Sequence, residues 1–226
     1  MTIAIEPCSQ FEGIYEAPEV ARFIAVTLSP RLPLRIPSDK VVRWIRLGLT
    51  TPELKEVPGR QLLLTFEDLI SMRVIAALRA AGVSFHKIRT AEKWLRSYTG
   101  HKRPFATEML WTERSDIFIE LKRQYVAASR FGQYAFTILE EYLIPVHGLM
   151  FDKRGVAVSW EPKEAILLDP LIQFGAPCIK GTRIPTRTLW GMIVGGDTME
   201  YVARSYRIAA ELVQNAVDWE NSLNRR

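Results

Sequence analysis

The sequence predicts a mainly α-helical protein with small β elements. Apolar residues recur at helical spacing towards both ends of the 226-residue chain, whereas stretches in the middle alternate in the way that suits strands. Loops rich in glycine and proline separate these segments. We therefore divide the chain into an N-terminal helical domain over residues 11–98, a mixed connector with a β-hairpin over 99–162, and a C-terminal trihelical domain over 163–226. Whether the connector serves dimerisation stays open.

Composition favours a chain that folds on an ordinary hydrophobic core. Hydrophobic residues make up 48% of it, and its two cysteines, Cys8 and Cys178, lie far apart. That spacing indicates neither a disulfide framework nor a thiolate zinc site, and it suits a reducing compartment. The N-terminus lacks an export-signal pattern, and no apolar run has the length of a bilayer span. We expect a cytoplasmic protein that does not enter the membrane.

The chain is moderately basic, with 30 Lys and Arg residues against 25 Asp and Glu residues and a net charge of +5. This excess permits an anionic partner such as nucleic acid without requiring one. The distribution of the basic residues therefore matters more than their sum.

Four helices are predicted between Tyr15 and Tyr98, and the second carries a basic cluster. It begins with Ser38 as N-cap and turns an apolar stripe inward. Cations at spacings of three project from its other side together with an indole, namely Lys40, Arg43, Trp44 and Arg46. This side is a candidate anion-binding face, and a merely solvated basic face is the alternative.

Cap and turn signals place the next two helices. Thr65 and Asp68 predict a capping box at the start of the third helix, and Gly82 ends that helix. The fourth helix starts from Ser84. Between the second and third helices, "TTPELKEVPGRQLLLT" is predicted to form a hairpin-like ribbon.

The rest of the chain is predicted to contain a hairpin and three short helices. The segment "GLMFDKRGVAVSW" indicates a hairpin that turns at residues 152–155. The first C-terminal helix is expected over residues 186–194 and ends at Gly195-Gly196. The second starts at Asp197, with Glu200 as a capping-box partner, and the third runs from about residue 209 to 219.

The segment "DPLIQFGAPCIKGTRIPT", residues 169–186, looks at first like a phosphate-binding loop. Such a loop needs a glycine, four residues and then Gly-Lys-Ser/Thr at the start of a helix. Here Lys180 precedes Gly181, Pro177 removes an amide, and Pro185 delays the helix. We therefore interpret the segment as a structural turn.

No pattern of catalytic residues stands out. The histidines His86, His101 and His147 lack metal-ligand spacing, and no nucleophile or two-metal signature is present. We predict a protein that is not an enzyme and that uses no metal or cofactor.

The N-terminal third resembles the MerR-like winged helix-turn-helix. The likeness runs through "YEAPEVARFIAV", "SDKVVRWIRLGL", "PGRQLLLTFEDLISMRVIAAL" and "RAAGVSFHKIRTAEKWL". The resemblance implies that the helix from Lys40 to Leu49 enters the major groove of DNA and that the ribbon from Glu53 to Leu64 is a wing on the DNA backbone. Groove contacts are then expected from the basic helix, and phosphate contacts from Arg22, Lys55 and Arg60.

The C-terminal segment resembles a small antitoxin-associated domain with the pattern G-x-P-x-I-x-G-T-R-I-P. The pattern follows Asp169-Pro170 and runs from Gly175 to Pro185. Taken together, the two resemblances make the chain similar to VapB-type antitoxins, whose partner is a PIN-domain ribonuclease. They imply a homodimer that neutralises this toxin and represses its own promoter by binding operator double-stranded DNA. A guanidinium competing with metal at the toxin's carboxylates is one implied route, with Arg183, Arg225 and Arg226 as candidates.

Two other functions are considered. A stand-alone, ligand-sensing transcription regulator without a toxin would share the DNA-binding domain, and a neighbouring reading frame for a small toxin would argue against it. A nucleic-acid-processing enzyme would need a buried cluster of acidic or histidine side chains. The C-terminal helices, which carry Arg204 and Arg207, are also open to DNA binding.

Overall fold

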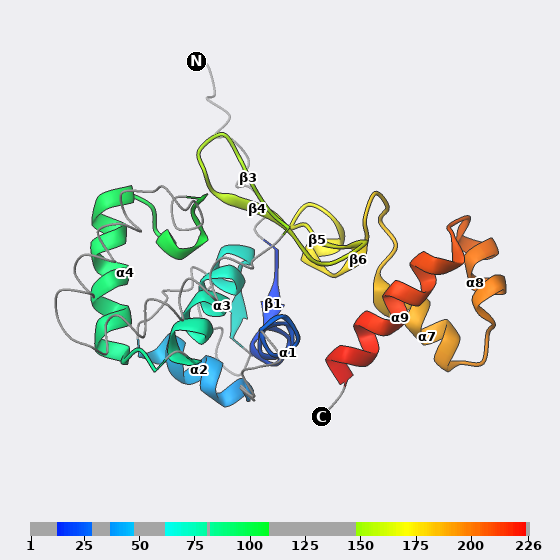
Figure 1. Ribbon diagram of the computed structural model, residues 1–226, viewed down its shortest axis with the longest axis horizontal. Coiled ribbons are helices and arrows are strands. Elements are labelled where there is room, and N and C mark those ends of the chain that lie inside the picture. Colours follow the sequence, from blue (N-terminus) through cyan, green and yellow to red (C-terminus); the bar gives the residue numbers. More distant parts are fainter. Residues whose placement is uncertain (1–12, 29–36, 48–61, 81, 109–147, 225–226) are drawn as a thin grey trace, which may run out of the picture.

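The computed structural model describes residues 13–28, 37–47, 62–80, 82–108 and 148–224. Within these ranges the chain is mainly helical with small antiparallel sheets, which confirms the predicted fold class at this level. The four predicted N-terminal helices are present as α1 (Ala17–Thr27), α2 (Ser38–Arg46), α3 (Phe66–Ala80) and α4 (Phe85–Thr99). They gather at one end of the molecule (Figure 1).

The described residues contain only the end of the predicted wing. There β2 (Leu63–Leu64) pairs antiparallel with β1 (Tyr15–Glu16), which directly precedes α1. Residues 48–61 lie outside the described ranges. The wing, and with it the winged helix-turn-helix arrangement, therefore stays a prediction.

Hydrogen bonds confirm two predicted helix starts. At α3 the Asp68 amide donates to Thr65 Oγ1 at 3.2 Å and the Thr65 amide donates to Asp68 Oδ2 at 3.1 Å, which completes the capping box. At α4, Ser84 Oγ accepts from the Lys87 amide at 3.4 Å. Both helices thus begin where the sequence places their caps.

Two other predicted caps are wrong by one residue. Pro37 is the N-cap of α2, so Ser38 is the first residue of the helix and not its cap. Proline's restricted φ supplies the extended entry that a capping residue needs. Thr198, and not Asp197, caps α8 (Met199–Tyr206), because Thr198 Oγ1 accepts from the Tyr201 amide at 3.2 Å.

A four-stranded antiparallel sheet occupies the middle of the molecule (Figure 1). Its strands, in spatial and chain order, are β3 (Leu149–Phe151), β4 (Ala157–Lys163), β5 (Ile166–Leu168) and β6 (Cys178–Ile179). The hairpin between β3 and β4 turns at residues 152–155 as predicted, and Gly155 supplies the left-handed residue with φ of 72°. β4 pairs with both β3 and β5. A single sheet therefore includes residues on both sides of the boundary predicted between the connector and the C-terminal domain, at residues 162 and 163.

Three helices end the chain, as the sequence predicts: α7 (Thr186–Val194), α8 and α9 (Ala210–Asn224). Both shorter helices pack on α9. α9 continues beyond Trp219, where the sequence suggested its end, because Leu223 extends the apolar stripe and packs against the core.

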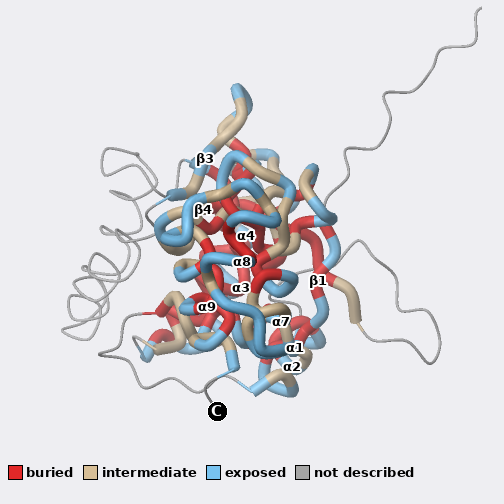
Figure 2. The backbone as a smooth tube through the Cα atoms, turned by 90° about the vertical axis from the view of Figure 1, so that its right-hand side faces the viewer, coloured by how far each residue is buried: buried red, intermediate tan, exposed pale blue. Residues whose placement is uncertain are grey.

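One hydrophobic core joins the N-terminal helices, the sheet and the C-terminal helices. Its buried residues run through the centre of the described chain (Figure 2). Helix α1 contacts α2 and α3 on one side and α9 on the other. The Phe23 ring of α1 stacks on Trp219 of α9 with their centroids 6.0 Å apart. The core therefore passes from the N-terminal helices to the C-terminal helices through α1.

Strand β1 is also hydrogen-bonded to the loop that precedes β6. Tyr15 Oη donates to Gly175 O at 2.9 Å, and the Ile14 amide donates to Phe174 O at 3.1 Å. Gly175 has a φ of 90°, and a Cβ added to it would lie 2.2 Å from Tyr15 Oη. Only glycine fits this close approach.

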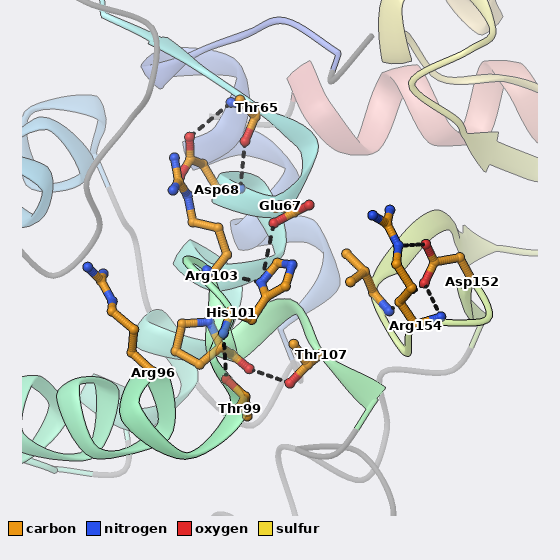
Figure 3. A network of polar contacts seen from close by, with 12 residues as sticks. Thr65, Glu67, Asp68, Arg96, Thr99, His101, Arg103, Thr107, Asp152 and Arg154 are labelled. Carbon is orange, nitrogen blue, oxygen red and sulfur yellow. Dashed lines mark hydrogen bonds and ion pairs between the residues drawn. The ribbon is translucent and has the colours of Figure 1, made fainter. Parts of the chain in front are cut away.

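A buried ion pair fixes the chain after α4 to the start of α3 (Figure 3). Arg103 Nε donates to Asp68 Oδ1 at 2.6 Å, and the two side chains are 5% and 0% exposed. Asp68 therefore serves both the capping box and the ion pair. His101 Nδ1 accepts from the Arg103 amide at 3.1 Å and lies 3.8 Å from Glu67 Oε2. Burial lowers the pKa of His101, which favours the neutral ring.

Arg73 of α3 is a second buried cation, and it joins three elements. Its Nη2 donates to Thr27 O at 3.0 Å and its Nε donates to Thr27 Oγ1 at 3.3 Å, at the end of α1. Its guanidinium carbon lies 5.5 Å from the ring centroid of Trp160 on β4. Burial lowers the pKa of Arg73 to about 10, so the side chain stays charged at neutral pH.

Replacing Gly175 with alanine should destabilise the fold, because the new Cβ meets the Tyr15 hydroxyl and the backbone has a positive φ. We expect a loss of about 1–3 kcal/mol in the free energy of unfolding, measured by denaturant titration. Gly181→Ala is the matched control, since its φ is 78° but nothing lies within 4 Å of the added Cβ. Equal losses in the two variants would mean that the Tyr15 contact contributes nothing.

Candidate nucleic-acid interface

Helix α2 turns its apolar side inward and its basic side outward. Val41, Trp44 and Ile45 are buried. The cations Lys40, Arg43 and Arg46, which we call the α2 basic stripe, are all exposed. Because residues three apart lie on nearly the same face of a helix, these side chains follow one line over about two turns.

The prediction that Trp44 accompanies the cations on this face is wrong. Its side chain is 3% exposed, and its ring meets that of Phe85, at the start of α4, edge to face with centroids 6.4 Å apart. The Arg79 guanidinium carbon covers the same Phe85 ring at 4.2 Å. Trp44 therefore anchors α2 to the core, and the exposed face carries the three cations without the indole.

The α2 basic stripe is open to an external anion. Within the described residues none of its three cations forms an ion pair with a carboxylate. Asp39 is the acidic residue in the first turn of α2. It lies at the positive end of the helix dipole, where a carboxylate is favourable. The stripe thus concentrates positive charge on a rigid helix whose other side is held in the core.

The predicted phosphate contact Arg22 is exposed on α1 but lies in a different electrostatic setting. Burial raises the pKa of Glu19 on the same helix and of Glu220 on α9, and the positive charge of Arg22 opposes part of that rise. Arg187 of α7 acts on the same two carboxyls. Arg22 therefore belongs to a charge cluster at the junction of α1, α7 and α9, and its role at DNA stays a prediction.

Most of the other predicted contact residues lie outside the described residues. Lys55 and Arg60, predicted to touch phosphate, lie outside the described residues, as do Arg225 and Arg226 among the candidate toxin contacts. Arg183 is described and exposed, and its Nη2 donates to Leu171 O at 3.4 Å. The structure thus does not bring the predicted toxin contacts together in one described site.

The third helix of the C-terminal unit carries the opposite charge to α2. α9 contains Glu211, Asp218 and Glu220 and no lysine or arginine. The first two of these are exposed. An acidic face repels the phosphate backbone of DNA. The exposed Arg204 on α8 and Arg207 just after it are among the basic residues through which this unit could touch DNA, as is the exposed Arg187 on α7.

The titratable side chains that could carry catalysis were sought in the described part of the chain. No group of three or more His, Cys, Asp or Glu side chains in these ranges could hold a metal ion. Cys178 is buried, and burial raises the pKa of its thiol to about 11, which keeps it in the unreactive protonated form. None of the described helices is long and apolar enough to cross a membrane.

One surface that the structure shows has no counterpart among the sequence predictions. Leu171 and Phe174, in the loop after β5, are 68% and 64% exposed, and Ile14 beside them is 44% exposed. Short loops have no hydrophobic periodicity, so the pattern of apolar residues cannot say which ones face solvent. A run of Asp-Pro, Gly and Pro predicts the turn but not the orientation of its side chains.

Glu220 gives the junction of α1, α7 and α9 a pH dependence. Thr186 Oγ1 donates to Glu220 Oε1, yet burial dominates and raises the pKa of this carboxyl above its ordinary value of 4.5. The folded state therefore binds a proton that the unfolded state has lost, so stability rises as the pH falls towards that value. Glu220→Gln, which keeps an acceptor for Thr186, should raise the melting temperature at pH 7 and weaken this trend. Glu211→Gln on the exposed side of α9 is the control. A pH profile unchanged in Glu220→Gln would contradict the assignment.

Comparison with known proteins finds one family, one relative and one solved structure that the chain resembles. Residues 166–219 match a family described as a protein of unknown function, DUF433. The chain is 24% identical to the "Putative antitoxin VapB45" of Mycobacterium tuberculosis, over 91% of this chain and 92% of that protein. Its fold resembles the X-ray crystal structure of Rv2018 from Mycobacterium tuberculosis, with a TM-score of 0.70, 20% identity, and coverage of 90% of this chain and 97% of that one. The chain is thus a distant homologue of VapB45 over most of its length, with a DUF433 domain at its C-terminal end.

Proposed function

We propose that this protein is the antitoxin of a type II toxin–antitoxin pair. In this role it neutralises a PIN-domain ribonuclease and represses its own operon by binding operator DNA through α2. The observation that carries the DNA-binding half is the α2 basic stripe, which is exposed and has no ion-pair partner in the described residues. The distant homology to VapB45 supports the toxin-binding half.

The geometry of α2 suits the major groove. The groove is about 12 Å wide and admits one α-helix. Arg43 and Arg46 can each donate two hydrogen bonds to guanine O6 and N7, whereas Lys40 offers a point charge for a phosphate or a base acceptor. Because Trp44 and Ile45 hold the opposite side in the core, these side chains project from a fixed base. A homodimer would place two such helices in successive grooves of a palindromic operator.

Neutralisation is a binding role, and we propose no catalytic step for this chain. The protein would act in the cytoplasm, where both its operator and the RNA targets of its partner are found. A stand-alone regulator is the second candidate, because the α2 basic stripe needs no toxin in order to bind DNA. An adjacent reading frame for a small PIN-domain protein separates the two.

Arg43→Ala should weaken binding to the operator by about 1–3 kcal/mol, because it removes a groove contact from the middle of the stripe. Fluorescence anisotropy with the native promoter fragment, at two salt concentrations, measures this loss. Arg204→Ala on α8 is the matched control, since it removes an exposed arginine from the other helical unit. Unchanged affinity in Arg43→Ala, with a loss in Arg204→Ala, would move the DNA contact to the C-terminal helices.

The purified chain should abolish cleavage of RNA by the PIN-domain protein encoded beside it, once the two are equimolar. A fluorogenic RNA assay measures the residual activity. Arg43→Ala should inhibit as well as the unaltered protein does, because the DNA-binding face is not needed for neutralisation. Undiminished cleavage at excess antitoxin would reject the toxin half of the proposal and leave the stand-alone regulator.

A further inference from the structure

An exposed surface rich in apolar side chains and carrying one arginine lies where strand β1 meets the C-terminal unit. We call it the Phe174 surface and define it by Ile14, Leu171, Phe174 and Arg183. The three apolar residues are 44%, 68% and 64% exposed, and Arg183 is exposed as well. Large exposed apolar side chains gathered in one place are uncommon unless the place serves an interaction.

Hydrogen bonds show that these residues are neighbours. Arg183 Nη2 donates to Leu171 O at 3.4 Å, and Gln173 Nε2 donates to Arg183 O at 3.1 Å. The Ile14 amide donates to Phe174 O at 3.1 Å. The surface therefore combines Ile14, just before β1, with the loop after β5 and the turn after β6, which lie far from Ile14 in the sequence.

The backbone of the loop is held in an unfavourable conformation that presents these side chains. Gln173 and Phe174 have φ values of 49° and 59°, and neither is glycine. Left-handed conformations cost free energy for such residues and persist only where the surrounding structure fixes them. Here the bond from Tyr15 Oη to Gly175 O fixes the next residue. A rigid, pre-formed surface loses little freedom when a partner binds.

The charge of Arg183 indicates the chemistry of the partner. Within the described residues, Arg183 forms no ion pair. Asp169 of the same loop accepts from the Leu171 amide at 2.8 Å and is not paired with Arg183. Arginine and aromatic residues are enriched in protein–protein interfaces. A guanidinium among exposed apolar groups matches a carboxylate surrounded by apolar surface, whereas a phosphate backbone offers nothing for Leu171 and Phe174.

We infer that the Phe174 surface is the docking site for the ribonuclease partner, which contributes an aspartate or glutamate ringed by apolar side chains. This inference rests on the proposed function, because it takes the partner to be the PIN-domain protein. It assigns partner binding to the junction between β1 and the C-terminal unit, and DNA binding to α2. The two activities then use separate residues and can be lost separately.

The test is a calorimetric titration of the full-length protein with the purified PIN-domain protein encoded beside it. Phe174→Asn removes the ring while asparagine tolerates the left-handed backbone. Arg183→Gln removes the charge. Val194→Asn is the matched control, because Val194 is 65% exposed at the end of α7 and lies outside the Phe174 surface. Melting temperatures and operator affinity are measured for every variant, so that misfolding is recognised.

We expect Phe174→Asn and Arg183→Gln each to weaken partner binding about tenfold or more, with operator affinity unchanged, and Val194→Asn to leave both intact. If the unaltered protein binds the PIN-domain protein and both variants bind it equally well, the inference fails and the proposed function stands. If the unaltered protein does not bind it, the toxin half of the proposed function fails and the inference with it. If the variants change only the self-association of the chain, measured by light scattering, the surface is a contact between copies and the inference is overturned.

Discussion

The packing of α1 against both ends of the molecule is the constraint on which the other features depend. Its Phe23 ring stacks on Trp219 of α9, and Arg73 of α3 donates to its last residue, Thr27. The strand before it is bonded to the loop at Gly175. Because α1 also packs on α2, the helix that carries the basic stripe is fixed relative to the C-terminal unit through a single core. The helix that we propose to contact DNA therefore already has a fixed position relative to the C-terminal unit.

The two helical units differ more in their surface charge than in their shape. Both contain three or more helices, yet α2 presents cations that form no ion pair among the described residues, whereas α9 presents Glu211 and Asp218. A phosphate backbone is attracted to the first and repelled by the second. The exposed residues on the C-terminal side are instead apolar around Arg183, which suits a protein partner. The proposed DNA-binding and partner-binding surfaces therefore use different residues.

Helix starts and tight turns could be predicted from the sequence, because they depend on residues that are close together in the chain. The Thr65–Asp68 capping box, the start of the fourth helix at Ser84 and the turn at Gly155 depend on residues a few positions apart, and all three are confirmed. The prediction for Trp44 is wrong because the spacing of Lys40, Arg43 and Arg46 defines only the basic side of the helix. Burial of the indole depends on its contact with Phe85 in another helix. The Tyr15 bond to Gly175 joins residues 160 positions apart, and the exposure of Phe174 follows from it, so neither can be read from a local pattern.

The measurement that tests the account most directly is recovery of the tagged protein from its native host after nuclease treatment, with intact masses recorded for everything that stays bound. Nuclease removes contaminants that are held only through DNA. If the protein is an antitoxin, a small PIN-domain protein should be retained in a fixed ratio to the chain. Recovery of the chain alone, while the pure protein still binds its promoter, would contradict the antitoxin function and establish a stand-alone regulator.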